Sequence, residues 1–304
     1  MSWNTSDIPD QSGRRVVVTG ANSGIGLEAT RELARAGAYV VMACRSVARG
    51  EDAADDVRRT VPGADLDVRE LDLADLDSVR AFAEGVEGEI DVLVNNAGVM
   101  AIPRSETADG FETQFGVNHL GHFALTGLLL DRVTDRVVTV SSRAHEGGEM
   151  DFDDLHGERD YARWEAYGQS KLSNLLFAYE LDRRLDAAGS DVESLACHPG
   201  WAATELQSGA ATNGAMELVM RAANAVVAQS AADGALPTLY AATAPEAEGG
   251  DYIGPGGLFD MRGAPEKQRS SARSRDRDAA RRLWEYSEEA TGVAFDLPEP
   301  EATA

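Results

Sequence analysis

Lysine is almost absent from this chain of 304 residues, in which it occurs only as Lys171 and Lys267. Cysteine is as rare, and both of its occurrences, Cys44 and Cys197, stand in apolar runs typical of strands. Two isolated cysteines exclude a disulfide framework and a cysteine-based metal cluster. We expect both to be small core residues.

Long apolar runs and metal-binding spacings are also missing. No stretch is long enough to span a bilayer, and no basic segment followed by an apolar one opens the chain, so we expect a cytoplasmic protein without a membrane span. The five histidines lack the spacing and the supporting carboxylates of a metal site. We therefore predict that the protein binds no metal.

Basic residues are outnumbered, because 28 lysines and arginines face 52 acidic residues and leave a formal net charge of −24. Phosphate backbones require a basic face, which excludes nucleic acid as a partner. An acid excess with little lysine resembles proteins of salt-loving microbes, in which concentrated cations screen the self-repulsion. We predict that low salt weakens folding.

The apolar residues, 43% of the chain, are enough for one substantial core. Segments typical of strands and helices alternate, which predicts an α/β fold with one doubly wound parallel sheet of about seven strands and helices on both faces. We expect a single domain over residues 13–296, with loose ends at 1–12 and 297–304. The expected strands are Arg15–Thr19, Tyr39–Ala43, Asp65–Leu71, Ile90–Val94, Arg136–Val140, Val192–Ala196 and Tyr252–Ile253. The expected helices are Gly24–Ala36, Ser46–Thr60, one capped near Asp75, Phe111–Leu130, Trp164–Leu185, Ser230–Thr243 and Pro265–Thr291.

A glycine-rich turn joins the first expected strand to the first expected helix, in the order Thr19-Gly20-Ala21-Asn22-Ser23-Gly24-Ile25-Gly26. Its glycines permit a tight bend and let a pyrophosphate approach the backbone. At the helix N-terminus, free N–H groups and the helix dipole favour an anion. The turn therefore predicts a dinucleotide site.

The end of the second expected strand indicates which dinucleotide is bound. A site selective for NAD usually carries an acid there, which binds the adenosine ribose hydroxyls. Here the sequence is Ala43-Cys44-Arg45-Ser46, without an acid. The planar guanidinium of Arg45 suits a 2′-phosphate, so NADP(H) is favoured over NAD(H).

Tyr167 and Lys171 lie four residues apart in an expected helix and therefore share one of its faces. A phenol has an ordinary pKa near ~10 and exchanges protons poorly at neutral pH unless a nearby cation favours its charged form. The pair is a candidate acid/base.

With the glycine turn and this pair, residues 14–260 resemble the short-chain dehydrogenase/reductase family, which has a Rossmann-type fold. Further matches are Asp72-Leu73, Asn95-Asn96-Ala97-Gly98, Val117-Asn118-His119 and His198-Pro199-Gly200. Three features resemble the NADP-linked, retinol-dehydrogenase-like subgroup. They are Ala43-Cys44-Arg45, the long spacing from Ser142 to Tyr167, and Arg281-Arg282-Leu283-Trp284-Glu285.

The resemblance implies an oxidoreductase that moves a hydride between NADP(H) and a carbonyl or alcohol. Tyr167 would exchange the proton with the substrate, and Lys171 would lower the pKa of Tyr167 and bind the nicotinamide ribose. Ser142 would donate to the substrate oxygen, and Asn118 would hold a water of a proton relay. The implied cofactor-binding residues are Gly20, Asn22, Ser23, Gly24, Ile25, Gly26, Arg45, Asp72, Leu73, Asn95, Ala97, Gly98, Tyr167, Lys171, Pro199, Gly200 and Thr204.

The same resemblance implies three larger features. The insertion Arg143 to Trp164 would lie over the site, and residues 201–228 would form a lid whose apolar side chains suit an apolar small-molecule substrate. A homodimer or homotetramer would form through the helices Phe111–Leu130 and Trp164–Leu185.

Two other functions remain open on the same fold. One is a non-catalytic, NADP-sensing regulator, although such proteins commonly lack the tyrosine or the lysine. The other is a nucleotide-sugar epimerase or dehydratase, against which stand the Gly-x-x-x-Gly-x-Gly spacing and a C-terminal region too short for a sugar-binding domain.

Overall fold

The computed structural model describes residues 2–200, 230–257 and 260–300. Within these ranges eight strands form one sheet in the order β3-β2-β1-β4-β5-β6-β7-β8. Strands β1 to β7 run parallel, and β8 is antiparallel to β7. The strands are β1 (Arg15–Thr19), β2 (Tyr39–Cys44), β3 (Asp65–Glu70), β4 (Ile90–Asn95), β5 (Val133–Val140), β6 (Glu193–Cys197), β7 (Tyr252–Pro255) and β8 (Pro265–Gln268).

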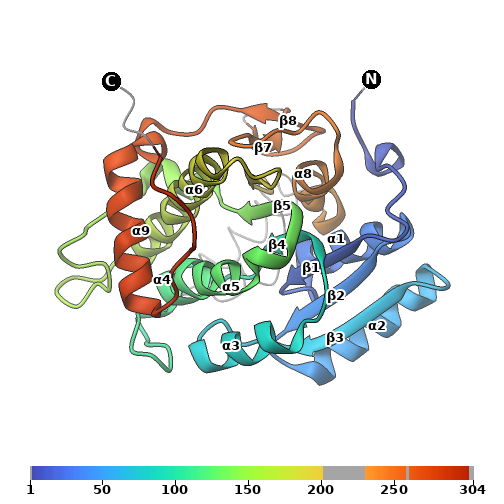
Figure 1. Cartoon of the computed structure of the whole chain (residues 1–304), viewed down its shortest axis with the longest axis horizontal. Coiled ribbons are helices and arrows are strands. Elements are labelled where there is room, and N and C mark those ends of the chain that lie inside the picture. Colours follow the sequence, from blue (N-terminus) through green and yellow to red (C-terminus); the bar gives the residue numbers. More distant parts are fainter. Residues whose placement is uncertain (1, 201–229, 258–259, 301–304) are drawn as a thin grey trace, which may run out of the picture.

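Helices cover both faces of the sheet (Figure 1). Helices α1, α2 and α8 pack on one face, and α3, α5 and α6 pack on the other. The predicted doubly wound α/β fold is therefore confirmed. The helices are α1 (Gly24–Arg35), α2 (Val47–Thr60), α3 (Leu76–Gly85), α4 (Thr113–Phe115), α5 (Gly121–Leu129), α6 (Arg163–Ala188), α8 (Ala231–Thr243) and α9 (Arg277–Thr291).

The central strands are apolar without alternation because both of their faces are buried. In β1, Val16 and Val18 belong to the cluster under α1 and α8, while Val17 belongs to the cluster under α3 and α5. All three are fully buried. This is the pattern of a parallel sheet between two helical layers, and each buried valine contributes about 1.5–3 kcal/mol.

The C-terminal region differs from the sequence prediction of one helix over Pro265–Thr291. Its first residues form β8, in which Pro265 pairs with Pro255 of β7, and α9 begins only after its cap, Asp276. Lys267 therefore lies on an edge strand, where it pairs with Glu248 and Asp251, and not in the closing helix. Charged residues are common on edge strands and on exposed helix faces, so the pattern did not distinguish the two.

The predicted helix Phe111–Leu130 is also interrupted. A π-helical turn, Gly116–Leu120, separates α4 from α5. Such turns occur frequently at functional sites, and this one contains Asn118.

Helix α9 lies against α5 and α6 (Figure 1). Its Trp284, which is 2% exposed, has its ring centroid 5.2 Å from that of Phe123 in α5 and 5.8 Å from that of Phe177 in α6. The aromatic surface of α5 and α6 is thus covered within the chain. These side chains are not available to the assembly interface that the resemblance implies.

The segment before β1, for which the sequence predicts a loose end, contacts the core. Trp3 packs edge-on against Tyr240 of α8 at 5.3 Å between ring centroids, and Gln11 is 1% exposed. Asn4 and Asp7 form a capping box around a short 3₁₀ turn. Order in this segment therefore comes from local caps and one aromatic contact.

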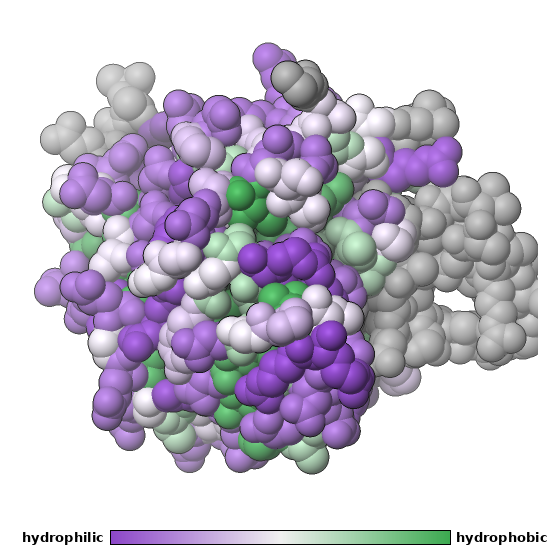
Figure 2. All heavy atoms as spheres, turned by 90° about the vertical axis from the view of Figure 1, so that its right-hand side faces the viewer, coloured by the Kyte–Doolittle hydropathy of each residue, from purple (hydrophilic) through white to green (hydrophobic). Residues whose placement is uncertain are grey.

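On the face that carries α1 and α2, the surface is predominantly hydrophilic, with small apolar areas between polar side chains (Figure 2). Many of its arginines pair with a carboxylate three residues away on the same helix, as Arg59 does with Asp56. None of the described helices combines the length and the apolarity that crossing a bilayer requires.

Candidate active site

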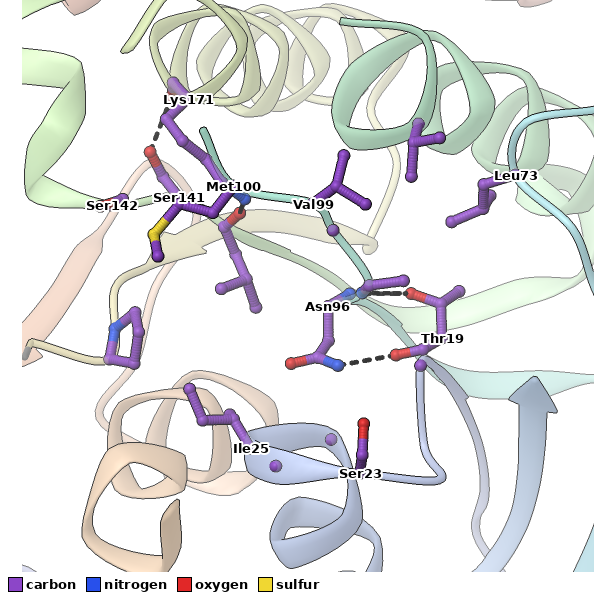
Figure 3. Close-up of a pocket in the computed structure, with 18 of the residues that line it drawn as sticks. Thr19, Ser23, Ile25, Leu73, Asn96, Val99, Met100, Ser141, Ser142 and Lys171 are labelled. Atoms are coloured by element: carbon purple, nitrogen blue, oxygen red, sulfur yellow. Dashed lines mark hydrogen bonds between the residues drawn. The ribbon is translucent and has the colours of Figure 1, made fainter. Parts of the chain in front are cut away.

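A cavity of about 700 Å³ opens at the carboxyl ends of the parallel strands. It lies where the strand order reverses between β1 and β4, the position at which open α/β sheets bind ligands. Most of its lining residues come from the loops after β1 to β6 and from α6. Figure 3 shows Ser23 and Ile25 on one side of the cavity, with Ser141, Ser142 and Lys171 across from them.

The glycine-rich turn lines this cavity with all of its predicted residues: Gly20, Asn22, Ser23, Gly24, Ile25 and Gly26. Gly20 has φ of +66°, a conformation that favours glycine, and a Cβ on Gly26 would lie 2.4 Å from the Gly20 carbonyl oxygen. Ser23 is the N-cap of α1 but makes no side-chain cap bond. The turn therefore leaves the first N–H groups of α1 for an anion.

Arg45, Asp72 and Leu73 line the cavity after β2 and β3, where the sequence predicts them. The Arg45 side chain is exposed and makes no ion pair within the described part of the chain. Arg49, which sequence reasoning missed, lines the same cavity from the first turn of α2. Its place as a second arginine soon after the end of β2 was the signal that could have identified it.

The loop after β4 places one predicted residue elsewhere. Ala97 and Gly98 line the cavity, but Asn95 is 1% exposed, and its amide donates to a threonine of α5 at 2.9 Å. The next residue, Asn96, lines the cavity instead, and its amide donates to the Thr19 carbonyl at 2.7 Å. Successive residues of a strand face opposite ways, so the asparagine pair could not both contact the cavity.

Three predicted catalytic residues, Ser142, Tyr167 and Lys171, line the cavity together. Ser142 follows β5, and its hydroxyl accepts from the Ala144 N–H at 3.2 Å. Tyr167 and Lys171 share one face near the start of α6, with the lysine Nζ 5.9 Å from the tyrosine ring centroid. The end of a strand and the face of one helix thus bring a hydroxyl, a phenol and an ammonium to one place.

Burial controls the proton equilibria of this group. Desolvation raises the pKa of Tyr167 to about 12, against the opposing effect of the Ser142 hydroxyl. Desolvation also lowers the pKa of Lys171 to about 8. The ammonium donates to the Val140 carbonyl at 3.1 Å. Desolvation and the Ser142 hydroxyl account for the pKa of Tyr167 in this structure, so the expected effect of Lys171 on that pKa stays a prediction.

Asn118, the fourth predicted catalytic residue, is fully buried behind the cavity wall. Its side-chain oxygen accepts from Val99 N–H at 2.8 Å, and its amide donates to the Val99 carbonyl and the Ser170 hydroxyl, both at 2.9 Å. Ser170 lies between Tyr167 and Lys171 on α6. Asn118 therefore ties the loop after β4 to the helix that carries the candidate acid/base.

A histidine that sequence reasoning did not select connects the same asparagine to the glycine turn. The Thr19 hydroxyl accepts from the Asn96 and Ala97 N–H groups, and it lies 2.9 Å from His122 Nε2 and 3.3 Å from the Val94 carbonyl oxygen. His122 Nδ1 then donates to the Asn118 carbonyl at 3.1 Å. Burial lowers the pKa of His122 to about 4, which keeps this bridge neutral at pH 7.

The insertion before α6 covers the site only in part. Arg143, Ala144, Glu146 and Trp164 line the cavity. Its middle packs away from the cavity, where Leu155 joins an apolar cluster with α9 and the His156 and Tyr286 side chains hydrogen-bond at 2.6 Å. The expectation that this insertion lies over the site therefore holds for its two ends and not for its middle.

Pro199 and Gly200, after β6, complete the described wall as predicted. Thr204 and the predicted lid at 201–228 lie outside the described residues. Two other lining residues, Met100 and Met261, carried no signal in the sequence because single methionines are common in plain packing.

No group of three or more His, Cys, Asp or Glu side chains among the described residues could hold a metal ion. Cys44 and Cys197 are free and buried, and desolvation raises their pKa values to about 11 and about 12. Both are therefore protonated, unreactive thiols at neutral pH.

Comparisons with known proteins agree with this geometry. The family model described as short chain dehydrogenase matches residues 14–214. Retinol dehydrogenase 12 of Mus musculus is 43% identical over 293 residues, which cover 93% of this chain and 88% of that protein. A crystal structure of an uncharacterized protein from Mycobacterium paratuberculosis is 48% identical, covers 98% of this chain and 100% of its own, and has a TM-score of 0.83.

Among the similar solved structures that hold a nucleotide is one with NADP. It is described as an NAD(P) dependent gluconate 5-dehydrogenase from Beutenbergia cavernae with bound NADP at low occupancy. It is 27% identical, covers 76% of this chain and 90% of its own, and has a TM-score of 0.58.

Proposed function

This chain belongs to the short chain dehydrogenase family, and we propose that it uses NADP(H) to interconvert a carbonyl and an alcohol in an apolar small molecule. As a family member it is an oxidoreductase of CH–OH or C=O groups. One observation carries the proposal. Ser142, Tyr167 and Lys171 line the same cavity as the glycine turn and Arg45.

The cavity fits a dinucleotide at three places. The glycine turn offers uncapped N–H groups at the start of α1 for a pyrophosphate. Asp72 and Leu73 flank the adenosine end. Arg45 offers a guanidinium after β2, where no acid is present to repel a 2′-phosphate, and Arg49 lines the same cavity. The bound NADP in the Beutenbergia cavernae relative is consistent with this choice.

The proposed chemistry follows from the protonation states. Bound NADPH supplies the hydride. Tyr167, whose pKa is about 12, keeps its proton at neutral pH and donates it to the substrate oxygen during carbonyl reduction. Ser142 donates a hydrogen bond to the same oxygen as negative charge develops there. Lys171, with a pKa of about 8, is mostly charged at pH 7 and stabilises the phenolate that Tyr167 leaves behind.

Apolar side chains near these groups support an apolar substrate. The Trp164 ring stands edge-on to Tyr167 at 6.2 Å between centroids and is 49% exposed. Val99, Met100 and Met261 add further apolar lining. The retinol dehydrogenases among the relatives favour retinoid-like aldehydes as the first compounds to test.

A reductase is favoured over a non-catalytic regulator and over a nucleotide-sugar epimerase, since retinol dehydrogenases are among the relatives that match nearly the whole chain. Turnover decides it: NADPH absorbance is followed with aldehydes, ketones and retinoid-like compounds. Tyr167→Phe should bind NADPH and lose about 10²–10⁴-fold in carbonyl reduction. Tyr179→Phe, on the same helix but outside the cavity, serves as the control. Retained turnover in Tyr167→Phe would remove this residue from the proposed role.

The coenzyme preference has its own test. Arg45→Ala should weaken NADPH binding about 10- to 100-fold, the range expected for a charge-assisted bond to phosphate, and should leave NADH binding unchanged. Arg281→Ala, an exposed arginine on α9, is the matched control. Equal dissociation constants for NADPH and NADH in the unaltered protein would contradict the NADP assignment.

A further inference from the structure

Three rings stack beside the proposed active site without a role in the chemistry above. The rings of His198 and Tyr252 are stacked at 5.1 Å between centroids, and His145 stands edge-on to Tyr252 at 5.5 Å. All three are buried. They come from different segments: His145 lies in the loop after β5, His198 directly follows β6, and Tyr252 begins β7.

The hydrogen bonds of His198 determine its tautomer. Nδ1 accepts the backbone N–H of Gly200 at 3.2 Å, so this nitrogen carries no proton. Nε2 therefore carries the proton and donates it to the Gln268 side-chain oxygen at 2.8 Å. The Gln268 amide in turn donates to the Pro255 carbonyl at 2.9 Å. Burial lowers the pKa of His198 to about 4, in agreement with a neutral ring.

This imidazole joins the Pro199–Gly200 turn to the hairpin of β7 and β8. Gly200 has φ of +66°, and a Cβ there would lie 2.4 Å from the Met261 carbonyl oxygen and 2.7 Å from Pro255 Cγ. The turn is thus packed tightly on its outer side. On its inner side, Pro199 and Gly200 line the cavity.

The strand order assigns this turn to one end of the cavity. Strand β6 is next to β5, whose end carries Ser142, whereas β2 and Arg45 lie beyond β1 at the other end. The backbone confirms the closeness of β5 and β6, because Ser141 N–H donates to the Cys197 carbonyl at 2.7 Å. The turn therefore borders the reacting end, where the nicotinamide of the proposed cofactor would lie.

We propose that His198 is a positioning residue, which holds the Pro199–Gly200 turn against the nicotinamide half of the cofactor through its bonds to Gly200 and Gln268. The inference rests on the proposed function. Strand β8 takes part in this positioning, because its Gln268 accepts the hydrogen bond from Nε2 of the imidazole.

The test compares two ligands that differ only at the nicotinamide end. NADPH has both halves, and 2′-phospho-ADP-ribose lacks the nicotinamide. His198→Leu removes both hydrogen bonds and should weaken NADPH binding about tenfold, while the dissociation constant for 2′-phospho-ADP-ribose stays within about twofold. His198→Asn should weaken NADPH binding less than His198→Leu, since its side-chain oxygen can accept the N–H two residues on in an Asx turn while the bond to Gln268 is lost.

Gln268→Leu gives an independent measurement, should His198→Leu fail to fold. It should weaken NADPH selectively but less than His198→Leu, because the Gly200 bond persists. His156→Leu is the matched control, since His156 bonds to Tyr286 of α9 and lies outside the cavity lining, and it should change neither dissociation constant.

Two results would overturn the inference while leaving the proposed function intact: unchanged NADPH binding in both His198→Leu and Gln268→Leu, or equal weakening of both ligands. If the unaltered protein bound neither ligand, the proposed function would fail, and the inference would fail with it.

Discussion

Replacing the buried lysine should make this protein more stable and inactive at the same time. Lys171 is 4% exposed, and burial lowers its pKa from 10.5 to about 8. At about 1.4 kcal/mol for each pKa unit, holding its charge inside the folded protein costs about 3 kcal/mol. Lys171→Met removes this cost. The Val140 carbonyl that Lys171 contacts keeps a donor, because the Asn174 amide donates to it at 3.0 Å.

The pH dependence of the stability shows whether the buried charge of Lys171 is the cause of this difference. Below pH 8 the lysine is charged in both the folded and the unfolded chain, so the whole cost is present; above 10.5 it is neutral in both, and the cost disappears. The stability advantage of Lys171→Met over the unaltered protein should therefore shrink by about 3 kcal/mol between pH 7 and pH 10.5. Any stabilisation that comes from the apolar methionine side chain itself is present at both pH values.

Urea unfolding in molar KCl at the two pH values measures this difference, and turnover of the same samples measures the loss of activity. The chain supplies a matched control in its only other lysine. Lys267 is exposed on β8 and paired with Glu248 and Asp251, so Lys267→Met should change stability by at most about 1 kcal/mol. An advantage of Lys171→Met that stays constant with pH, or a loss of stability at pH 7, would refute the reasoning.

Three further predictions concern the site and the surface. Lys171→Arg keeps the charge but replaces a compact ammonium by a wide fork, so kcat/KM should fall at least about tenfold; full activity in a turnover assay would contradict this. Gly26→Ala places a Cβ 2.4 Å from the Gly20 carbonyl oxygen and should abolish NADPH binding in titrations, whereas Gly85→Ala, whose Cβ has its nearest neighbour at 3.9 Å, should not. With a net charge of −24, the melting temperature should rise by several degrees from dilute buffer to molar KCl; coincident melting curves would show that self-repulsion is unimportant.

The features predicted well from the sequence depend on neighbours along the chain. The apolar strands are continuous runs, and Asp75 caps α3 by accepting from the Asp77 and Ser78 N–H groups, so local patterns located both. The glycine turn and the spacing of Tyr167 and Lys171 are likewise local. These elements were enough to place most of the cavity lining.

The features that were missed depend on contacts between distant residues. The site's hydrogen-bond network joins Thr19, His122 and Asn118, which belong to segments separated by about one hundred residues. Histidines at such positions have no pattern that separates them from packed core residues. The same holds for β8: only its pairing with β7, and not its charged sequence, makes Pro265–Gln268 a strand.

The scarcity of lysine and the survival of Lys171 have separate physical causes. A preference for arginine and acids acts through water and salt at the surface, and the buried Nζ of Lys171 is outside that influence. The requirement for lysine at position 171 is steric. A Cβ on Gly98 would lie 3.0 Å from the Asn118 side-chain oxygen and 3.6 Å from Lys171 Nζ, which shows how closely the wall approaches the ammonium. A guanidinium would have to displace that wall, so the preference for arginine over lysine on the surface does not apply at position 171.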